Sequence, residues 1–253
     1  DGFLYLAAAL FFTFKFRKKM TRIVKRLLKL AYLLSFTSIV WGVLTASFFG
    51  IKMDPDTPLR KSSTLNYLAE KKAEYHLHQK DDVYRTWVTR YPELESATDA
   101  HQFFLGASDT KQGEREYLAL DEFYENVLME IALLVGVIHL VCSMARYGLR
   151  NYANFGWILF TIGGYLYLPS VIGATSLIHF LGILLPETAF ALGKILFAGG
   201  FGLALVLSCI QNKLKGLLEV TNSIQIFSDV LSYIRLYALG LAGMILAATF
   251  NKL

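Results

Sequence analysis

A single arginine stands inside an apolar stretch near the end of the sequence. Arg235 lies in SDVLSYIRLYALGLAG, residues 228–243, where most of its neighbours are aliphatic or small. A guanidinium stays charged at every physiological pH and hydrocarbon cannot solvate it, so an arginine at membrane depth requires water or a carboxylate beside it. The chemistry open to Arg235 is therefore electrostatic: it can attract an anionic group, but it cannot release a proton.

Polar residues precede Arg235 in alternating steps of four and three residues. Such spacing places them on one face of a helix. A polar stripe that runs from a helix end to a buried charge is expected of a water-accessible inlet from the cytoplasmic side. The stripe consists of Thr221, Gln225, Ser228, Ser232 and Arg235, and the neighbouring Asp229 is added as a candidate residue of the same path.

Few acids could neutralise Arg235 within the chain. Asp229 is close in sequence, but it lies about 120° around a helix from the arginine. One interpretation is a static ion pair inside the chain, with Glu130, Asp229, Glu187 and Glu219 as candidates. Because no acid lies obviously opposite Arg235, the other interpretation is a carboxylate from another subunit, or water.

Four further polar residues lie within or beside apolar segments, and they could line a second aqueous path on the outer side. The alternative for the histidine is a hydrogen-bonded packing role. The alternative for the charged residues is a side chain that extends to the membrane surface. These candidates are Glu130, His139, Glu187 and Lys194.

The remaining residues of metal-binding type predict no metal site. His76, His78 and His101 lack a further ligand at a recognisable spacing, so we interpret them as solvated histidines of a loop. Cys142 and Cys209 lie in apolar segments without a CxxC spacing, which favours packing. The sequence also contains no phosphate-binding loop and no Ser/His/Asp arrangement, so we expect no cofactor and no catalytic activity of the chain itself.

Composition identifies an integral membrane protein. The chain has 253 residues, of which 55% are hydrophobic and gathered in long blocks, and its mean hydropathy is +0.43. The net charge of +5 does not indicate nucleic-acid binding, because eight basic residues fall in the single run 15–29 beside an apolar block. Such a run is typical of a cytoplasmic anchor.

Charge and hydropathy together predict an all-α fold, a polytopic transmembrane helical bundle with about six spans. Residues 1–51 form a transmembrane hairpin with a basic cytoplasmic turn. Residues 52–126, with fifteen acids against ten bases, form a non-cytoplasmic polar loop. Residues 127–253 form a bundle that ends in a long, tilted ion-path helix at 224–250.

The expected spans are separated by short links. The stretch 173–188 is too short for a confident further span, so we expect it at the outer interface or re-entering. The chain begins without methionine and stops after an apolar helix, and we therefore expect a fragment. The spans are predicted at 2–16, 30–51, 127–145, 153–172, 189–210 and 224–250.

The stretch FSDVLSYIRLYALGLAG resembles the signature of the membrane subunit of V-type and archaeal-type rotary ATPases, called subunit a in eukaryotes and subunit I in bacteria and archaea. The family motif S-Y-(I/L/V)-R-L-x-A-L-x-L-A surrounds an arginine that corresponds to Arg235. Further similarity lies in DGFLYL at the start, in WGVLTASFFG (41–50) and in VGVIHL (135–140). The resemblance covers almost the whole chain.

The resemblance implies a stator subunit that forms ion half-channels against a c/K proteolipid ring and couples proton or sodium movement to ATP hydrolysis or synthesis. Arg235 then attracts each passing ring carboxylate. It also implies a peripheral stalk and a V1/A1 head as partners, through an N-terminal domain, and a bacterial or archaeal plasma membrane. Two other classes stay open: a secondary transporter that binds an anionic substrate through Arg235, and a structural membrane scaffold.

Overall fold

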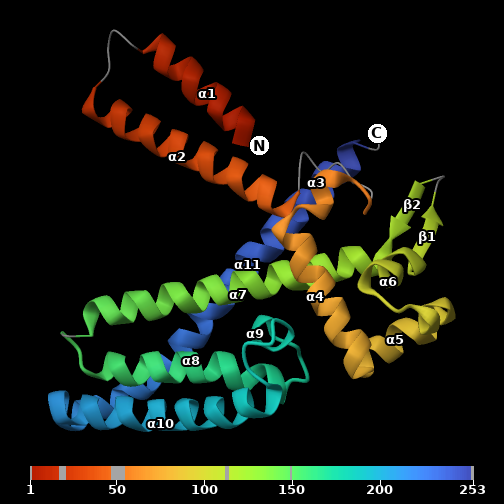
Figure 1. Ribbon diagram of the computed structural model, residues 1–253. Coiled ribbons are helices and arrows are strands. Elements are labelled where there is room, and N and C mark those ends of the chain that lie inside the picture. The colour runs from red at the N-terminus through yellow and green to blue at the C-terminus, as the bar shows by residue number, and fades with distance from the viewer. Residues whose placement is uncertain (1, 17–20, 47–54, 112–113, 149, 252–253) are drawn as a thin grey trace. The chain divides into compact units, whose positions relative to one another are not determined.

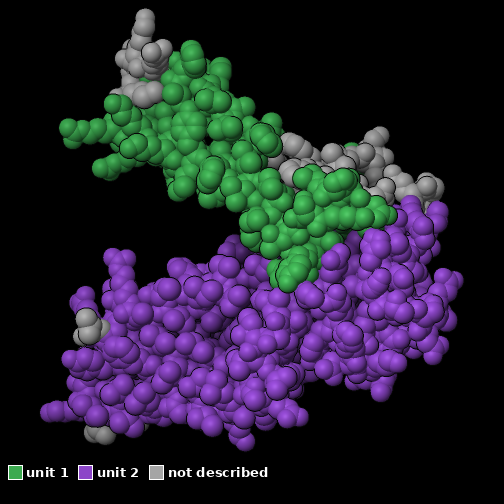
Figure 2. Space-filling model, in the orientation of Figure 1, with its two compact units in different colours: residues 1–68, 242–253 green, residues 69–241 purple. Residues whose placement is uncertain are grey.

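Helices make up nearly all of the protein, so the predicted all-α class is confirmed (Figure 1). The computed structural model describes residues 2–16, 21–46, 55–111, 114–148 and 150–251. The chain divides into two compact units, each described by itself below. The first comprises Asp1–Leu68 with Ala242–Leu253, and the second comprises Ala69–Leu241 (Figure 2).

The first unit contains a helical hairpin. Its two helices meet at Gly2, where a Cβ would lie 2.9 Å from the backbone nitrogen of Ile39. The Thr13 and Tyr32 hydroxyls share a hydrogen bond of 2.8 Å. The second helix begins at Arg22, after the Thr21 N-cap, so part of the predicted basic turn is helical. The helices of this unit are α1 (Gly2–Lys15), α2 (Arg22–Thr45) and α3 (Pro58–Lys61).

The polar region predicted as a loop is folded, and it has its own aromatic core. The rings of Trp87, Phe103, Phe104 and Phe123 contact one another at centroid distances of 5.6–6.5 Å. The two strands pair antiparallel, with Ser108 opposite Tyr117. The elements are α4 (Thr64–Gln79), α5 (Asp82–Arg90), η1 (Pro92–Ser96), α6 (Ala100–Gly106), β1 (Ser108–Lys111) and β2 (Glu114–Tyr117).

The apolar bundle begins directly after strand β2. Its first helix begins at Leu118, nine residues before the predicted start at 127. Hydropathy could not predict this earlier start, because the first turns of the helix contain acidic residues. The elements are α7 (Leu118–Tyr147), α8 (Ala153–Val171), α9 (Leu177–Phe180), α10 (Pro186–Asn212), η2 (Lys213–Glu219) and α11 (Val220–Asn251).

Four helices of the described residues are long and apolar enough to cross a membrane: α2, α7, α10 and α11. The apolar α1 is shorter. Helix α8, predicted as a span at 153–172, is not among them, since its asparagine, tyrosines and glycines lower its mean hydropathy. The long last helix is confirmed at 32 residues, whereas the number of six spans stays a prediction.

Helices α8 and α10 run side by side with their backbones almost in contact (Figure 1). A Cβ added at Gly193 would lie 2.7 Å from the Tyr167 backbone nitrogen. A Cβ added at Gly200 would overlap the backbone nitrogen of Phe160. Such small-residue contacts allow the close approach that stabilises helix pairs in membranes. The rings of Phe160 and Phe197 stack beside this contact, 4.4 Å apart.

Replacing Gly200 by alanine is expected to destabilise the protein by about 1–3 kcal/mol, because the added methyl group forces the two backbones apart. The matched control is Gly202→Ala on the same helix, where nothing lies within 4 Å of the new Cβ. That change is expected to be neutral or to stabilise by up to about 1 kcal/mol, through the higher helix propensity of alanine. Thermal unfolding in detergent measures both, and equal effects would contradict the packing argument.

Candidate functional site

Helix α11 packs on the bundle through one of its faces. Ile226 is 5% exposed and lies in a core with Trp157, Phe160 and Ala204. The ring of Tyr233 covers Gly136 of α7, and the hydroxyl of Tyr237 donates a hydrogen bond of 2.8 Å to the Glu125 carbonyl. Ile226, Tyr233 and Tyr237 recur at steps of seven and four residues. This spacing defines the packed face of the helix.

Arg235 lies on the opposite face of α11. Nine residues separate it from Ile226, which is a rotation of about 180° at 3.6 residues per turn. The arginine is exposed, and its neighbours Leu231 and Leu239 on that face are 55% and 66% exposed. Within the described part of the chain it makes no ion pair. In particular, none pairs it with the internal candidates Glu130, Asp229, Glu187 and Glu219.

The predicted polar stripe lies on the arginine's side of the helix. Thr221, Gln225 and Ser228 are exposed, and Ser232 is half-buried. The Ser232 hydroxyl donates a hydrogen bond of 2.9 Å to the Ser228 carbonyl, so its hydrogen-bond partner lies within the same helix. Asp229 is half-buried between the stripe and the packed face. The arginine face of α11, defined here by Thr221, Gln225, Ser228, Leu231, Ser232, Arg235 and Leu239, thus combines a polar band with exposed leucines.

Polar contacts join the end of α10 and the segment before α11 to the rest of the bundle. The indole nitrogen of Trp157 donates to the Glu219 carboxylate at 3.3 Å, and the Asn222 amide also donates to this carboxylate. Nearby, the side chain of Gln211 accepts from the Tyr152 backbone and donates to the Arg150 carbonyl, both at 3.1 Å. The α7–α8 link and the end of α10 therefore meet.

The four outer-side candidates do not come together. Glu130 is buried, whereas Glu187 and Lys194 are exposed. His139 is also exposed, and its Nδ1 is hydrogen-bonded to the Tyr233 hydroxyl on α11. Nine residues separate Glu130 from His139, so they occupy opposite faces of α7. Only Glu130 combines burial with charge.

The partner of Glu130 is Lys72 of α4, at 2.5 Å. The side chains of both are nearly buried, so the interpretation that Glu130 extends to the membrane surface is wrong. Sequence reasoning missed Lys72, because it assigned the whole region to a solvated loop. A signal existed: Ala69, Ala73 and His76 share one buried face of α4 with Lys72, at helical spacing.

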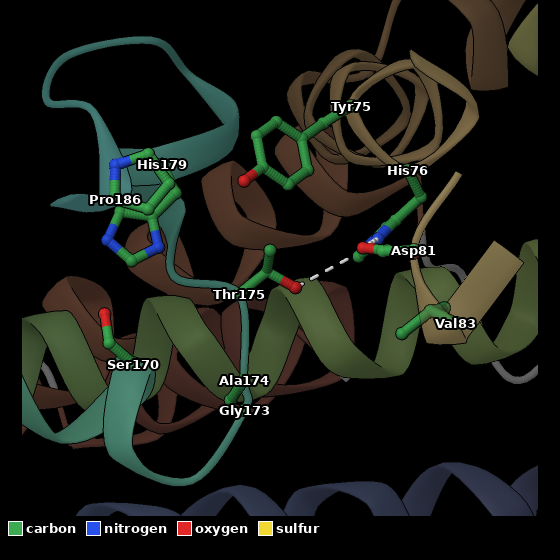
Figure 3. Close-up of a pocket in the computed structure, with 10 residues that line it drawn as sticks. All are labelled: Tyr75, His76, Asp81, Val83, Ser170, Gly173, Ala174, Thr175, His179 and Pro186. Atoms are coloured by element: carbon green, nitrogen blue, oxygen red, sulfur yellow. Dashed lines mark hydrogen bonds and ion pairs between the residues drawn. The ribbon is translucent and has the colours of Figure 1, made fainter. Parts of the chain in front are cut away.

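A cavity of about 270 Å³ opens between the α4–α5 turn and the α8–α10 link (Figure 3). The two segments are distant in sequence, and both are predicted to lie outside the cytoplasm. The described residues hold no cluster of three or more His, Cys, Asp or Glu side chains suited to a metal ion. The cavity is lined by Tyr75, His76, Asp81, Val83, Ser170, Gly173, Ala174, Thr175, His179 and Pro186.

His76 is 2% exposed, so the interpretation of it as a solvated histidine is wrong. Its Nδ1 lies 2.5 Å from the Asp81 carboxylate, and its Nε2 lies 3.3 Å from the Thr175 hydroxyl. Burial lowers the pKa of His76 below its ordinary value, and Asp81 opposes that shift. A neutral ring satisfies both contacts, because Nδ1–H donates to Asp81 while Nε2 accepts from Thr175.

Relatives of this chain share one description. An alignment of 255 positions, which covers the whole chain, gives 42% identity to V-type ATP synthase subunit I of Chlamydia pneumoniae. The chain is 42% identical over 252 residues, 98% of its length, to the subunit of that name from Chlamydia trachomatis serovar D. In Borreliella burgdorferi, V-type ATP synthase subunit I is 26% identical over 42% of the chain.

These matches cover less of the relatives than of the chain. The chain spans 39% of the length of each chlamydial relative. The sequence matches no protein-family model, and no solved structure matches it. The similarity nevertheless extends across the whole chain and includes the segment around Arg235. The chain therefore belongs to the V-type ATP synthase subunit I family, which confirms the resemblance that the arginine motif indicates.

Proposed function

We propose that this chain is the membrane part of a stator in a V-type or archaeal-type rotary ATPase. It couples the movement of protons or sodium ions to ATP hydrolysis or synthesis, and its arginine face meets the carboxylates of a c/K ring. The observation that carries this proposal is the position of Arg235. It lies opposite the packed face of α11, exposed and without an ion pair among the described residues.

The mechanism follows from the permanent charge of the guanidinium. A ring carboxylate that reaches Arg235 is stabilised in its ionised form, so it gives up the ion it carried. Lysine is less suitable at this depth, since desolvation favours its neutral form. The pair must also separate again, which requires water beside it. Gln225, Ser228 and Ser232 supply a polar route from the end of the helix.

The two ends of the path are assigned from the predicted topology. Basic residues 15–29 and the links at 148–152 and 213–219 lie in the cytoplasm, and residues 52–126 lie outside. The cytoplasmic half-channel follows the stripe from Thr221 and passes Asp229. On the outer side Glu130 is the strongest candidate because it is buried. His139, Glu187 and Lys194 have weaker support because they do not converge with it.

Contacts with the peripheral stalk and the ATPase head belong to the same proposal. We assign them to the part of the longer relatives that this chain does not span. A secondary transporter with an anionic substrate is less well supported. Such a transporter holds its substrate within its own bundle, whereas Arg235 faces away from the helices on which α11 packs.

Cross-linking tests the proposed contact in the assembled complex. Leu239→Cys places a thiol on the arginine face, and Ile195→Cys places one on α10, where the native side chain is 70% exposed. Both are made after Cys142 and Cys209 have been replaced by serine, and each thiol carries a benzophenone maleimide. We expect light to join Leu239→Cys, but not Ile195→Cys, to a small carboxylate-bearing ring protein. The absence of a Leu239 adduct in an assembled complex would contradict the assignment.

A further inference from the structure

Basic side chains gather on one face of α2, in its first turns. Every other residue between 22 and 30 is aliphatic. At 100° per residue, the four bases of this segment fall within an arc of about 100°. All four side chains are exposed. The basic stripe of α2 is defined here as Arg22, Lys25, Arg26 and Lys29.

Helix α1 does not cover the basic stripe. The two helices lie side by side in the hairpin (Figure 1), and the backbones of Ser35 and Ile39 adjoin Gly2 of α1. Ser35, which is 0% exposed, marks the packed face of α2. It follows Lys29 by six residues, a rotation of about 120° around the helix. The stripe therefore lies on a different side of α2 from its partner helix.

The hairpin contains no acid that could neutralise the stripe. Residues 2–53 include no Asp or Glu. Asp56, the next described acid, pairs with Lys61 at 2.8 Å, and no ion pair among the described residues involves the stripe. Its bases are spaced three and four residues apart, and like charges at these spacings destabilise a helix. The electrostatic partner of the stripe must therefore come from outside the hairpin.

The same face of α2 becomes apolar after the stripe. Leu33, Phe36 and Val40 continue the arc, and they are 58%, 66% and 40% exposed. Helix α2 is long and apolar enough to cross a membrane. One helix face thus presents cations at its beginning and apolar side chains further along. An anionic phospholipid has the matching order, with a phosphate above its acyl chains, whereas a free phosphate ion would leave the apolar part uncovered.

We propose that the basic stripe of α2 binds the headgroup of an anionic phospholipid, whose acyl chains lie along Leu33, Phe36 and Val40. Arginine can give two parallel hydrogen bonds to a phosphate, and lysine adds a point charge. A basic run that only orients a hairpin in the membrane needs positive charge but no particular helix face. The site goes beyond the proposed function, because it depends neither on Arg235 nor on rotation.

Photolabelling of the unaltered, assembled complex tests the site. The complex is placed in phosphatidylcholine bilayers with a trace of phosphatidylglycerol that carries a diazirine near the start of an acyl chain. We expect light-induced adducts within residues 22–40, which unlabelled phosphatidylglycerol displaces and added phosphatidylcholine does not. The absence of such adducts, or equal displacement by phosphatidylcholine or by inorganic phosphate, would overturn the proposal.

A transposed variant separates a site on one helix face from general attraction to anionic lipids. The changes Arg26→Leu, Leu27→Arg, Lys29→Leu and Leu30→Lys keep the composition and the net charge. The receiving positions are suitable, since Leu27 and Leu30 are 60% and 52% exposed.

The transposed variant is expected to give at least about tenfold less adduct, because each basic residue beside an anionic lipid strengthens binding roughly fivefold and two are displaced. Unchanged labelling in a variant that assembles normally would refute a site on this face. If the variant does not assemble, the lipid competition in the unaltered complex still decides the question. Labelling should also be unchanged in Arg235→Lys, so failure of the proposed function and failure of the lipid site are distinguishable.

Discussion

Replacing Arg235 by lysine is expected to reduce coupled ion transport at least about a hundredfold, as removal of one preorganised electrostatic group does in other sites. Assembly should be unaffected, because the arginine is exposed and makes no ion pair within the described structure. Lysine has nearly the same reach, but it can lose its charge when it is desolvated. Ion uptake and ATP hydrolysis measured together in membrane vesicles check this expectation.

Two variants complete the arginine experiment. Leu231→Met on the arginine face should leave transport near the wild-type level, since it changes shape but not charge. Arg235→Ala should abolish transport while the complex still assembles. Normal pumping by Arg235→Lys would refute the stator mechanism. Loss of assembly alone in Arg235→Ala would favour the structural scaffold.

Lys72→Met is expected to lower the stability of the second unit by about 3–5 kcal/mol, the usual cost of removing one partner from a buried ion pair. The cost is high because the Glu130 carboxyl group is left buried without its cation, so it must either stay charged in a poorly solvated site or take up a proton. Thermal unfolding of the detergent-purified complex, followed by protease resistance of α4, measures the loss.

The neighbouring residue provides the control for this change. Lys71 pairs with Glu74 at 2.7 Å, but both side chains are about two-fifths exposed. Lys71→Met should therefore cost less than about 1 kcal/mol. In the double variant Lys72→Met/Glu130→Leu no charge is left buried, so most of the lost stability should return. Equal effects of the two lysine substitutions would contradict the importance of the buried pair.

Hydropathy and charge predicted the features that depend on nearby residues. The hairpin at the start, the long apolar helices and the stripe ending at Arg235 all follow from helical spacing within one segment. Lys72 and Glu130 could not be paired in this way, because 58 residues separate them and only the docking of α4 brings them together. The burial of His76 could not be predicted for the same reason, because its contact with Thr175 joins residues that are 99 positions apart.

The start of α7 and the close packing of α8 on α10 could not be predicted from the sequence either. Helix α7 extends from Leu118 because its acidic turns pack on the folded polar region rather than in lipid. The glycines of α8 and α10 could be interpreted from sequence as flexible points, but each of Gly156, Gly163, Gly193 and Gly200 fits against a backbone. That role depends on the partner helix, which no single segment specifies.

The contact between α8 and α10 has a mechanical consequence. Ile226 of α11 rests on Phe160 and Ala204, which lie beside the closest approach of those two helices. A sideways force on the arginine face is therefore transmitted through Ile226 to two helices whose backbones are in close contact. Packed interiors have low compressibility, so little of the force is absorbed as deformation. The bundle can therefore resist sideways displacement of α11.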